Sequence, residues 1–97
     1  MLPGEEFAPR TMEVQNMESR IAAVAIVIED QVVATPAVNK ILSQYGEIIV
    51  GRMGIPYKAK NLSVISLIVD ATADEIGALT EKLRQIDKVH VETAVAK

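Results

Sequence analysis

The chain has 97 residues, a length that fits one domain with a thin hydrophobic core. Hydrophobic residues make up 49% of it but aromatic residues only 3%, so the core is expected to consist of Val, Ile, Leu and Ala. The absence of Cys excludes disulfides, thiolate metal sites and a Cys nucleophile. A net charge of −3 argues against a protein that binds nucleic acid through its own surface. No apolar run approaches the roughly 20 residues of a membrane span, and the first ten residues lack a secretory pattern. We therefore expect a cytoplasmic protein.

The first 17 residues differ from the rest of the chain. They contain Pro3, Gly4 and Pro9 with scattered charges and no sustained hydrophobic period. Such a composition predicts a flexible tail over residues 1–17, followed by one domain over residues 18–97.

Residues 21–28 (IAAVAIVI) are apolar at every position and rich in Val and Ile, which favours a central strand over a buried helix. Thr35 and Pro36 then suit the N-cap and the first position of a helix. Gly46 stands where a glycine would end that helix. One face of the predicted helix is apolar at helical spacing, through Val38, Ile41, Leu42 and Tyr45.

Residues 47–53 return to strand character, and Pro56 is expected to stop that run. Gly51 and Gly54 should weaken a strand, so they predict a bulge, a sharp bend, or the close approach of another backbone or a ligand. A polar connection over residues 57–61 would make a hairpin with a second β-branched run over residues 62–70.

Thr72 and Glu75 have the spacing of a capping box, which predicts a second helix start. Alternation of apolar and polar residues over 89–95 predicts a last strand with one solvated face. The second helix should bury a stripe and expose Glu81 and Arg84; the stripe consists of Ile76, Leu79, Leu83 and Ile86.

The resulting order, β-α-β-β-α-β, predicts an α+β domain of the ferredoxin-like type, with two helices on one face of a four-stranded antiparallel sheet. The other sheet face would then be uncovered although the first strand is apolar on both sides. An uncovered apolar face on a small protein predicts an interface, so we expect a homo-oligomer, a dimer or a tetramer.

The residues indicate no catalytic site and no metal site. His90, the only histidine, falls on the solvated face of the last strand with Glu92 two residues on. One His and one carboxylate are too few for a closed metal site unless a symmetric dimer doubles the set. Asp70, Asp74 and Glu75 are explained by helix capping and by the helix dipole.

Nucleotide and nucleic-acid sites have weak support. The spacing of Gly51 and Gly54 matches neither phosphate-binding glycine motif, and no helix follows them. Arg52, Lys58 and Lys60 cluster by the hairpin, as a solvated loop or as a contact for an anion, a metabolite or a protein. The sheet lacks the aromatics that would stack bases.

The run GRMGIPY over residues 51–57, with Tyr45-Gly46 before it and Ile65-Ser66-Leu67 after it, resembles the iron-only hydrogenase system regulators. The resemblance covers about residues 17–97. These proteins are ferredoxin-like and similar to ACT domains and to the ligand-binding half of nickel-responsive repressors. The resemblance implies a regulatory role in the hydrogenase system and brings no catalytic residues. The lone histidine departs from the several His and one Cys of the nickel repressors.

These observations lead to a non-enzymatic regulatory module that oligomerises through its sheet and binds a small effector, of unidentified chemistry, at a subunit interface. The alternatives are a protein-interaction subunit without a small ligand and an enzyme whose site is shared between subunits. Any action on DNA is expected to need a DNA-binding partner. The effector or interface site is predicted to comprise Gly51, Arg52, Met53, Gly54, Ile55, Pro56 and Tyr57.

Overall fold

The computed structural model describes residues 18–96. The predicted N-terminal tail, residues 1–17, lies outside this range. The described chain forms β1 (Ser19–Ile28), α3 (Gln31–Gln44), the short 3₁₀ helix η1 (Gly46–Ile48), β2 (Ile49–Tyr57), a second 3₁₀ helix η2 (Lys58–Lys60), β3 (Leu62–Thr72), α4 (Ala73–Arg84) and β4 (Val89–Val95).

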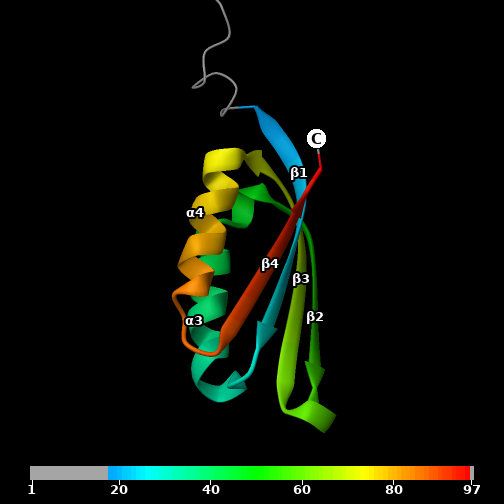
Figure 1. Ribbon diagram of the computed structural model, residues 1–97, viewed down its shortest axis with the longest axis vertical. Coiled ribbons are helices and arrows are strands. Elements are labelled where there is room, and N and C mark those ends of the chain that lie inside the picture. The colour runs from blue at the N-terminus through cyan, green and yellow to red at the C-terminus, as the bar shows by residue number, and fades with distance from the viewer. Residues whose placement is uncertain (1–17, 97) are drawn as a thin grey trace, which may run out of the picture.

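The four strands form one antiparallel sheet in the order β2-β3-β1-β4, and both helices lie on the same side of it (Figure 1). This is the ferredoxin-like arrangement that the sequence predicted. The first strand and the third strand are central, whereas β2 and β4 are the two edges. Each edge strand is therefore paired along only one side.

The hydrophobic core fills the space between the helices and the sheet. Alternate residues of β1 and β3 point into it, and the apolar stripe of each helix covers them from the other side. Within residues 18–96 no aromatic ring is fully buried, although Tyr45 packs partly buried against the core. The largest fully buried side chains are Val24, Ile26, Ile28, Val38, Leu42, Leu67, Val69, Leu79 and Leu83.

The capping box at the start of α4 is formed as predicted. The Thr72 hydroxyl oxygen accepts a hydrogen bond from the Glu75 backbone N–H at 3.1 Å, and the Glu75 carboxylate accepts one from the Thr72 N–H at 2.9 Å. Two of the backbone N–H groups at the helix start are thereby satisfied. Ile76, Leu79 and Leu83 are buried, while Ile86 lies just after the helix and is partly buried.

The first helix begins earlier than the sequence predicted. Asp30 is its N-cap and its carboxylate accepts a bond from Val33 N–H, so Thr35 and Pro36 lie inside α3. The prediction was wrong because Pro36 is tolerated one turn further in. Its missing N–H removes one helical hydrogen bond, the one to the Val32 carbonyl, and Val32 lies at a solvent-exposed end of the helix.

The helix ends just before Gly46, as predicted, but its cap differs, and one further boundary differs from the prediction. Tyr45 caps α3 and Gly46 starts η1 without a positive φ angle, so no left-handed glycine ends the helix. Pro56 does not stop β2, which continues to Tyr57. A proline has no N–H for a ladder, but β2 is an edge strand and one side of it needs no partner. Asn61, with φ 56°, closes the predicted hairpin after η2.

Candidate functional site

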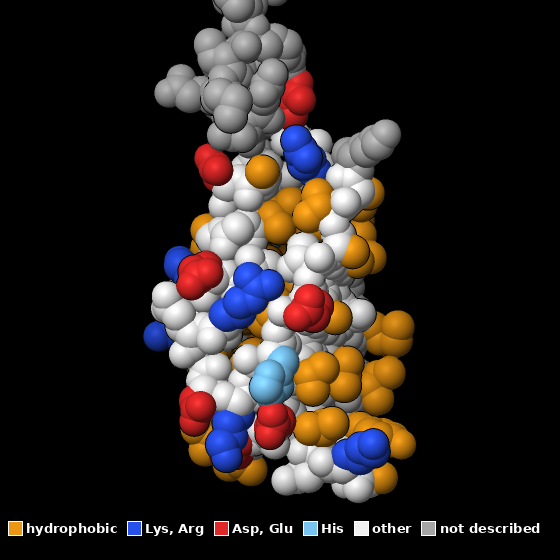
Figure 2. All heavy atoms as spheres, in the orientation of Figure 1, with side chains coloured by type: hydrophobic (Ala, Val, Ile, Leu, Met, Phe, Trp, Pro, Cys, Tyr) orange, Lys and Arg blue, Asp and Glu red, His pale blue; other side chains and the backbone are white. Residues whose placement is uncertain are grey.

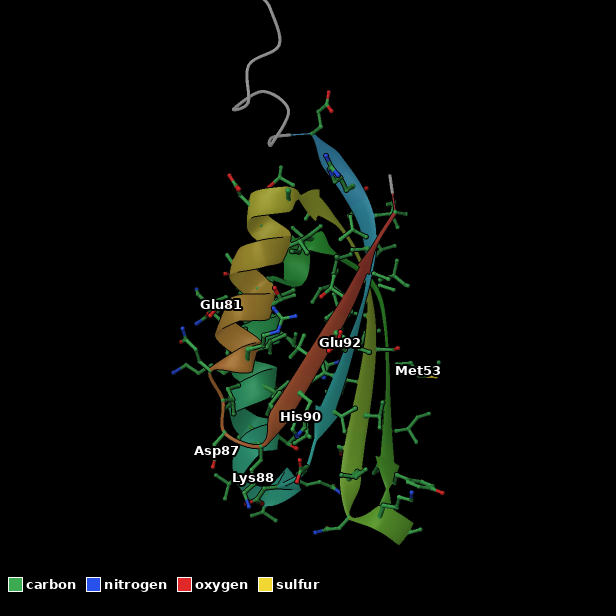
Figure 3. The ribbon with its side chains drawn as sticks, viewed as in Figure 1. Met53, Glu81, Asp87, Lys88, His90 and Glu92 are labelled. Carbon is green, nitrogen blue, oxygen red and sulfur yellow. The ribbon has the colours of Figure 1, made fainter. Side chains whose placement is uncertain are left out.

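The sheet face opposite the helices is not covered within the described chain (Figure 1). We call it the open face. It carries large apolar side chains on three strands, and these have substantial exposure: Ile21 44%, Met53 61%, Ile55 52%, Tyr57 49% and Ile68 44%. Met53 points away from the helices in Figure 3. Water contact of so many apolar groups on one face is costly, so the open face is the strongest candidate for a binding surface.

The open face has an apolar half and a polar half. The apolar half lies over β2 and β3, where Met53 and Ile55 pair with Ser66 and Val64. The polar half lies along β4, which contributes His90 and Glu92. Figure 2 shows hydrophobic side chains gathered along the sheet side of the molecule, with charged groups toward the viewer. A partner of the open face would thus be apolar opposite β2 and polar opposite β4.

The predicted segment, residues 51–57, is divided between the two faces of the sheet. Cross-strand partners in an antiparallel pair share a face, so Gly51 lies on the open face with Ile68, its partner on β3. Arg52 pairs with buried Leu67 and lies on the helix face. Alternation along the strand then assigns each remaining residue to a face. The open face carries Met53, Ile55 and Tyr57 beside Gly51, and the helix face carries Gly54 and Pro56 beside Arg52.

A β-bulge at the start of β2 sets this division. Ile49 pairs with Val69, and Gly51 pairs with the adjacent Ile68, so Val50 is the extra residue. A bulge was one of the three causes that the sequence offered for the glycines. It shifts the alternation by one residue and so turns Gly51 and Met53 toward the open face.

The two glycines have different surroundings. A Cβ atom on Gly54 would meet Ile65 Cγ1 at 3.8 Å, an ordinary contact inside the molecule. A Cβ on Gly51 would meet nothing within 4 Å, and no described glycine has a positive φ angle. Neither packing within the described chain nor the φ angle therefore requires a glycine at position 51. The glycine leaves the backbone of the open face uncovered there, so that another molecule can approach it closely.

Arg52 is held by the neighbouring helix. Its Nη2 donates a hydrogen bond to the Asn39 side-chain oxygen of α3 at 2.6 Å. The bond ties the edge strand to the helix and takes one of five guanidinium donors, leaving the others for a carboxylate or phosphate. No sequence pattern indicated Asn39 as a partner, because the contact depends on the sheet face to which the bulge turns Arg52.

The three basic residues by the hairpin do not act as one cluster. Arg52 turns to α3, whereas Lys60 helps to line a polar groove of ≈ 410 Å³ together with Glu29, Asp30 and Lys88. This groove mixes two carboxylates with two ammonium groups, so it has no single charge to offer an ion.

His90 has a partner that the sequence did not suggest. Its Nε2 contacts the Glu29 carboxylate at the end of β1, and both side chains are at least half exposed. Because strand β4 runs antiparallel to β1, His90 is opposite Val27 and close to the strand end that carries Glu29. Glu92 lies two residues on, also along β4 (Figure 3). Between residues 18 and 96, no three His, Asp or Glu side chains come together in a way that could hold a metal ion.

The family of the chain follows from a comparison with family models. Residues 20–93 match the TM1266-like model, described as "Iron-only hydrogenase system regulator, putative". The chain belongs to this family. The match contains both helices and the whole of the 51–57 segment, and it agrees with the family that the GRMGIPY run resembled.

Among solved structures, one relative agrees with this assignment and a more distant one shares the fold. The uncharacterised protein TM1266 from Thermotoga maritima is 39% identical to this chain, covers 82% of it with 100% of its own length, and superposes with a TM-score of 0.80. The ACT domain of GTP pyrophosphokinase from Chlorobium tepidum is 23% identical, with a TM-score of 0.67, over 78% of this chain and 99% of that domain. No curated protein is similar enough to the chain to count as a match.

A third structure shows how little the fold alone says about function. The de novo designed protein Foldit4 covers 82% of this chain with 98% of its own length, at 9% identity and a TM-score of 0.52. A sequence designed without ancestry reaches the same arrangement, so function must be argued from the sites on the sheet and helices. No helix in residues 18–96 is long and apolar enough to span a membrane.

Proposed function

We propose that this chain is a non-enzymatic sensing regulator of the iron-only hydrogenase system that assembles into a homo-oligomer and acts in the cytoplasm. The observation that carries the proposal is the open face, where Ile21, Met53, Ile55, Tyr57 and Ile68 are exposed together. The family membership supports the regulatory role.

A second copy of the chain is the proposed cover for the open face. The face combines an apolar half with a polar half, and a two-fold interface brings the same patch on both subunits together. Antiparallel docking would place β2 against β2 or β2 against β3, leaving the His90 and Glu92 side at the solvated rim. Charged groups belong at the rim and apolar groups at the centre of such interfaces.

The effector is proposed to bind beside the 51–57 segment, where two open faces meet. Gly51 allows a close backbone approach there, and Met53 offers an adaptable apolar contact. Arg52 lies on the other face of the strand. Effector binding would therefore alter its bond to Asn39, or Arg52 would itself bind an anion at the sheet edge. In this proposal ligand binding and assembly depend on each other.

The alternative without a small ligand is a protein-interaction subunit. It uses the same open face, with the glycines serving only the bulge and the packing of Ile65. An enzyme with a shared site gains no support from the His90–Glu29 pair, which is solvent-exposed and remote from the apolar half of the face. Any control of transcription would require a separate DNA-binding partner.

Native mass spectrometry of freshly purified protein tests the proposal, because it reports subunit number and any co-purified mass together. We expect a dimer or tetramer that carries an additional small mass. Met53→Lys should give monomer by placing a charge in the apolar half of the open face. Val33→Lys is the matched control, since Val33 is at least as exposed as Met53 but lies at the start of α3.

A wild-type monomer at micromolar concentration would overturn the assembly and the effector site that depends on it. A clean oligomer without added mass, followed by no stabilisation from any compound in a ligand screen, would favour the protein-interaction alternative. Equal loss of assembly in Met53→Lys and Val33→Lys would show that the open face is not the interface.

A further inference from the structure

A groove between α4 and the edge strand β4 lies on the helix side of the sheet, away from the open face. Its volume is ≈ 340 Å³, at the small end of the range for ligand sites. We call it the α4–β4 groove. Its lining is mainly apolar, with two arginines and no acidic residue; it consists of Arg20, Ala73, Ile76, Gly77, Thr80, Arg84, Thr93 and Val95. The groove faces the viewer in Figure 2, where hydrophobic side chains lie between basic groups.

Gly77 is the first sign that the groove receives another molecule. It lies in the middle of α4, where a glycine is less favourable than an alanine because it loses more backbone entropy on folding. A Cβ atom at this position would meet nothing within 4 Å, so packing within the described chain does not demand the glycine. The missing side chain instead leaves room in the groove wall.

Thr93 supplies a second and independent sign. Its side chain belongs to the groove wall, and its hydroxyl oxygen is screened from solvent with no hydrogen-bond partner. An unpaired polar atom of this kind costs free energy unless something else bonds it. Across the groove, the Thr80 hydroxyl donates to the Gly77 carbonyl at 3.1 Å and is already satisfied. Thr93 thus contributes an unsatisfied polar group to the groove wall.

Arg84 is held in place at the groove. Its Nη2 donates to the Val91 backbone carbonyl at 3.2 Å, and its other donors remain for a second acceptor. That carbonyl belongs to the free edge of the sheet. Ala96 N–H bonds to the Ile21 carbonyl, and Glu29 N–H bonds to the Lys88 carbonyl, so the backbone groups of Lys88 and Ala96 face β1. Because this direction alternates along β4, the backbone groups of Val91 and Thr93 point away from β1.

The charge of the groove selects the ligand class. Arg20 and Arg84 attract an anion, and the apolar wall of Ala73, Ile76 and Val95 suits a short hydrocarbon chain. No acidic residue of the lining could receive an ammonium group. We propose that the α4–β4 groove binds a small aliphatic carboxylic acid without an amino group, with its carboxylate at Arg84.

This proposal does not rest on assembly through the open face, and its test can be read on a monomer or on an oligomer. The probes are 4-methylpentanoate, its neutral amide 4-methylpentanamide, and leucine, which adds an ammonium group to the same skeleton. For a ligand of this size we expect a Kd on the order of 1 mM. Each probe is titrated into ¹⁵N-labelled full-length protein, and amide shifts are followed.

We expect 4-methylpentanoate to shift the amides of Gly77, Thr80, Thr93 and Val95, while the neutral amide and leucine bind at least about tenfold more weakly. Arg84→Gln should weaken acid binding about tenfold by removing a charge-assisted contact. Lys40→Gln, an exposed cation of α3, is the matched control and should bind as the wild type.

Gly77→Leu should fill the groove and abolish binding while the rest of the spectrum is unchanged, because leucine favours the helix and its Cβ meets nothing. The proposal is wrong if the acid shifts none of these amides, if leucine or the amide binds as tightly, or if Gly77→Leu binds as the wild type. It is equally wrong if Gly77→Leu changes the subunit number and no probe binds, since the groove would then be a contact between chains.

Discussion

Two threonines of this chain have opposite surroundings, and substitution of each should change stability with opposite sign. Thr72→Ala removes the hydroxyl that caps α4 and should lower the free energy of unfolding by about 1 kcal/mol. Thr35→Val replaces a screened hydroxyl that has no partner by a methyl group of the same shape. It should raise the free energy of unfolding by about 1 kcal/mol. Urea denaturation at one protein concentration measures both changes.

Glu75→Gln is the control for the capping box, because glutamine still offers an oxygen to the Thr72 N–H and should change stability little. A stable Thr72→Ala protein would mean that packing of Ile76 and Leu79 alone fixes the start of α4. A destabilised Thr35→Val protein would mean that the Thr35 hydroxyl has a partner in solution.

At the scale of residues, the sequence predicted local features and missed those that join distant segments. The capping box was predictable because Thr72 and Glu75 are three residues apart. The contacts of Arg52 with Asn39 and of His90 with Glu29 join different elements, so no local spacing indicates them. The α4–β4 groove did leave a signal: Gly77, Thr80 and Arg84 share one helix face, and Thr93 falls on the helix side of its strand.

Pro36 allows a test at the scale of an element. The structure places it inside α3, where it removes the hydrogen bond to the Val32 carbonyl. Pro36→Ala should therefore restore that bond and raise the free energy of unfolding by about 1 to 3 kcal/mol. Circular dichroism during thermal unfolding would show a higher Tm and no loss of helix.

A lower Tm for Pro36→Ala would support the start that the sequence predicted, with Pro36 as the first helical residue and residues 31–35 outside the helix. Asp30→Ala is the complementary variant. It should destabilise the protein by about 1 kcal/mol if Asp30 is the N-cap, and by little if the helix starts at Thr35.

Element order was predictable here because the hydrophobic period changes clearly along the chain, whereas two element boundaries were not. Pro36 was predicted to begin a helix and Pro56 to end a strand, yet Pro36 lies within a helix and Pro56 within a strand. Both are tolerated for a reason outside their local sequence. The helix start is exposed to solvent, and β2 is at the edge of the sheet.

At the scale of the whole molecule, the sequence predicted an uncovered sheet face because both sides of residues 21–28 are apolar. It did not predict how the 51–57 segment divides between the faces. That division follows from the bulge at Val50, which changes the alternation of every later residue in β2. The same shift gives Gly51, rather than Gly54, to the open face.

Gly51→Val tests whether that division matters for assembly. Nothing lies within 4 Å of a Cβ at this position, and valine favours a strand, so the folded chain should be at least as stable as the wild type. A subunit packed closely over the bare backbone would instead be displaced. Overpacking typically costs 1 to 3 kcal/mol, so the Kd of the oligomer should rise about tenfold. Sedimentation velocity over a dilution series measures that Kd.

Gly46→Ala is the control variant. A Cβ at Gly46 also has no contact within 4 Å, but Gly46 lies in η1, so this variant should assemble as the wild type. Normal assembly of Gly51→Val would mean that the glycine serves only the bulge and that no subunit packs closely against β2 on the open face.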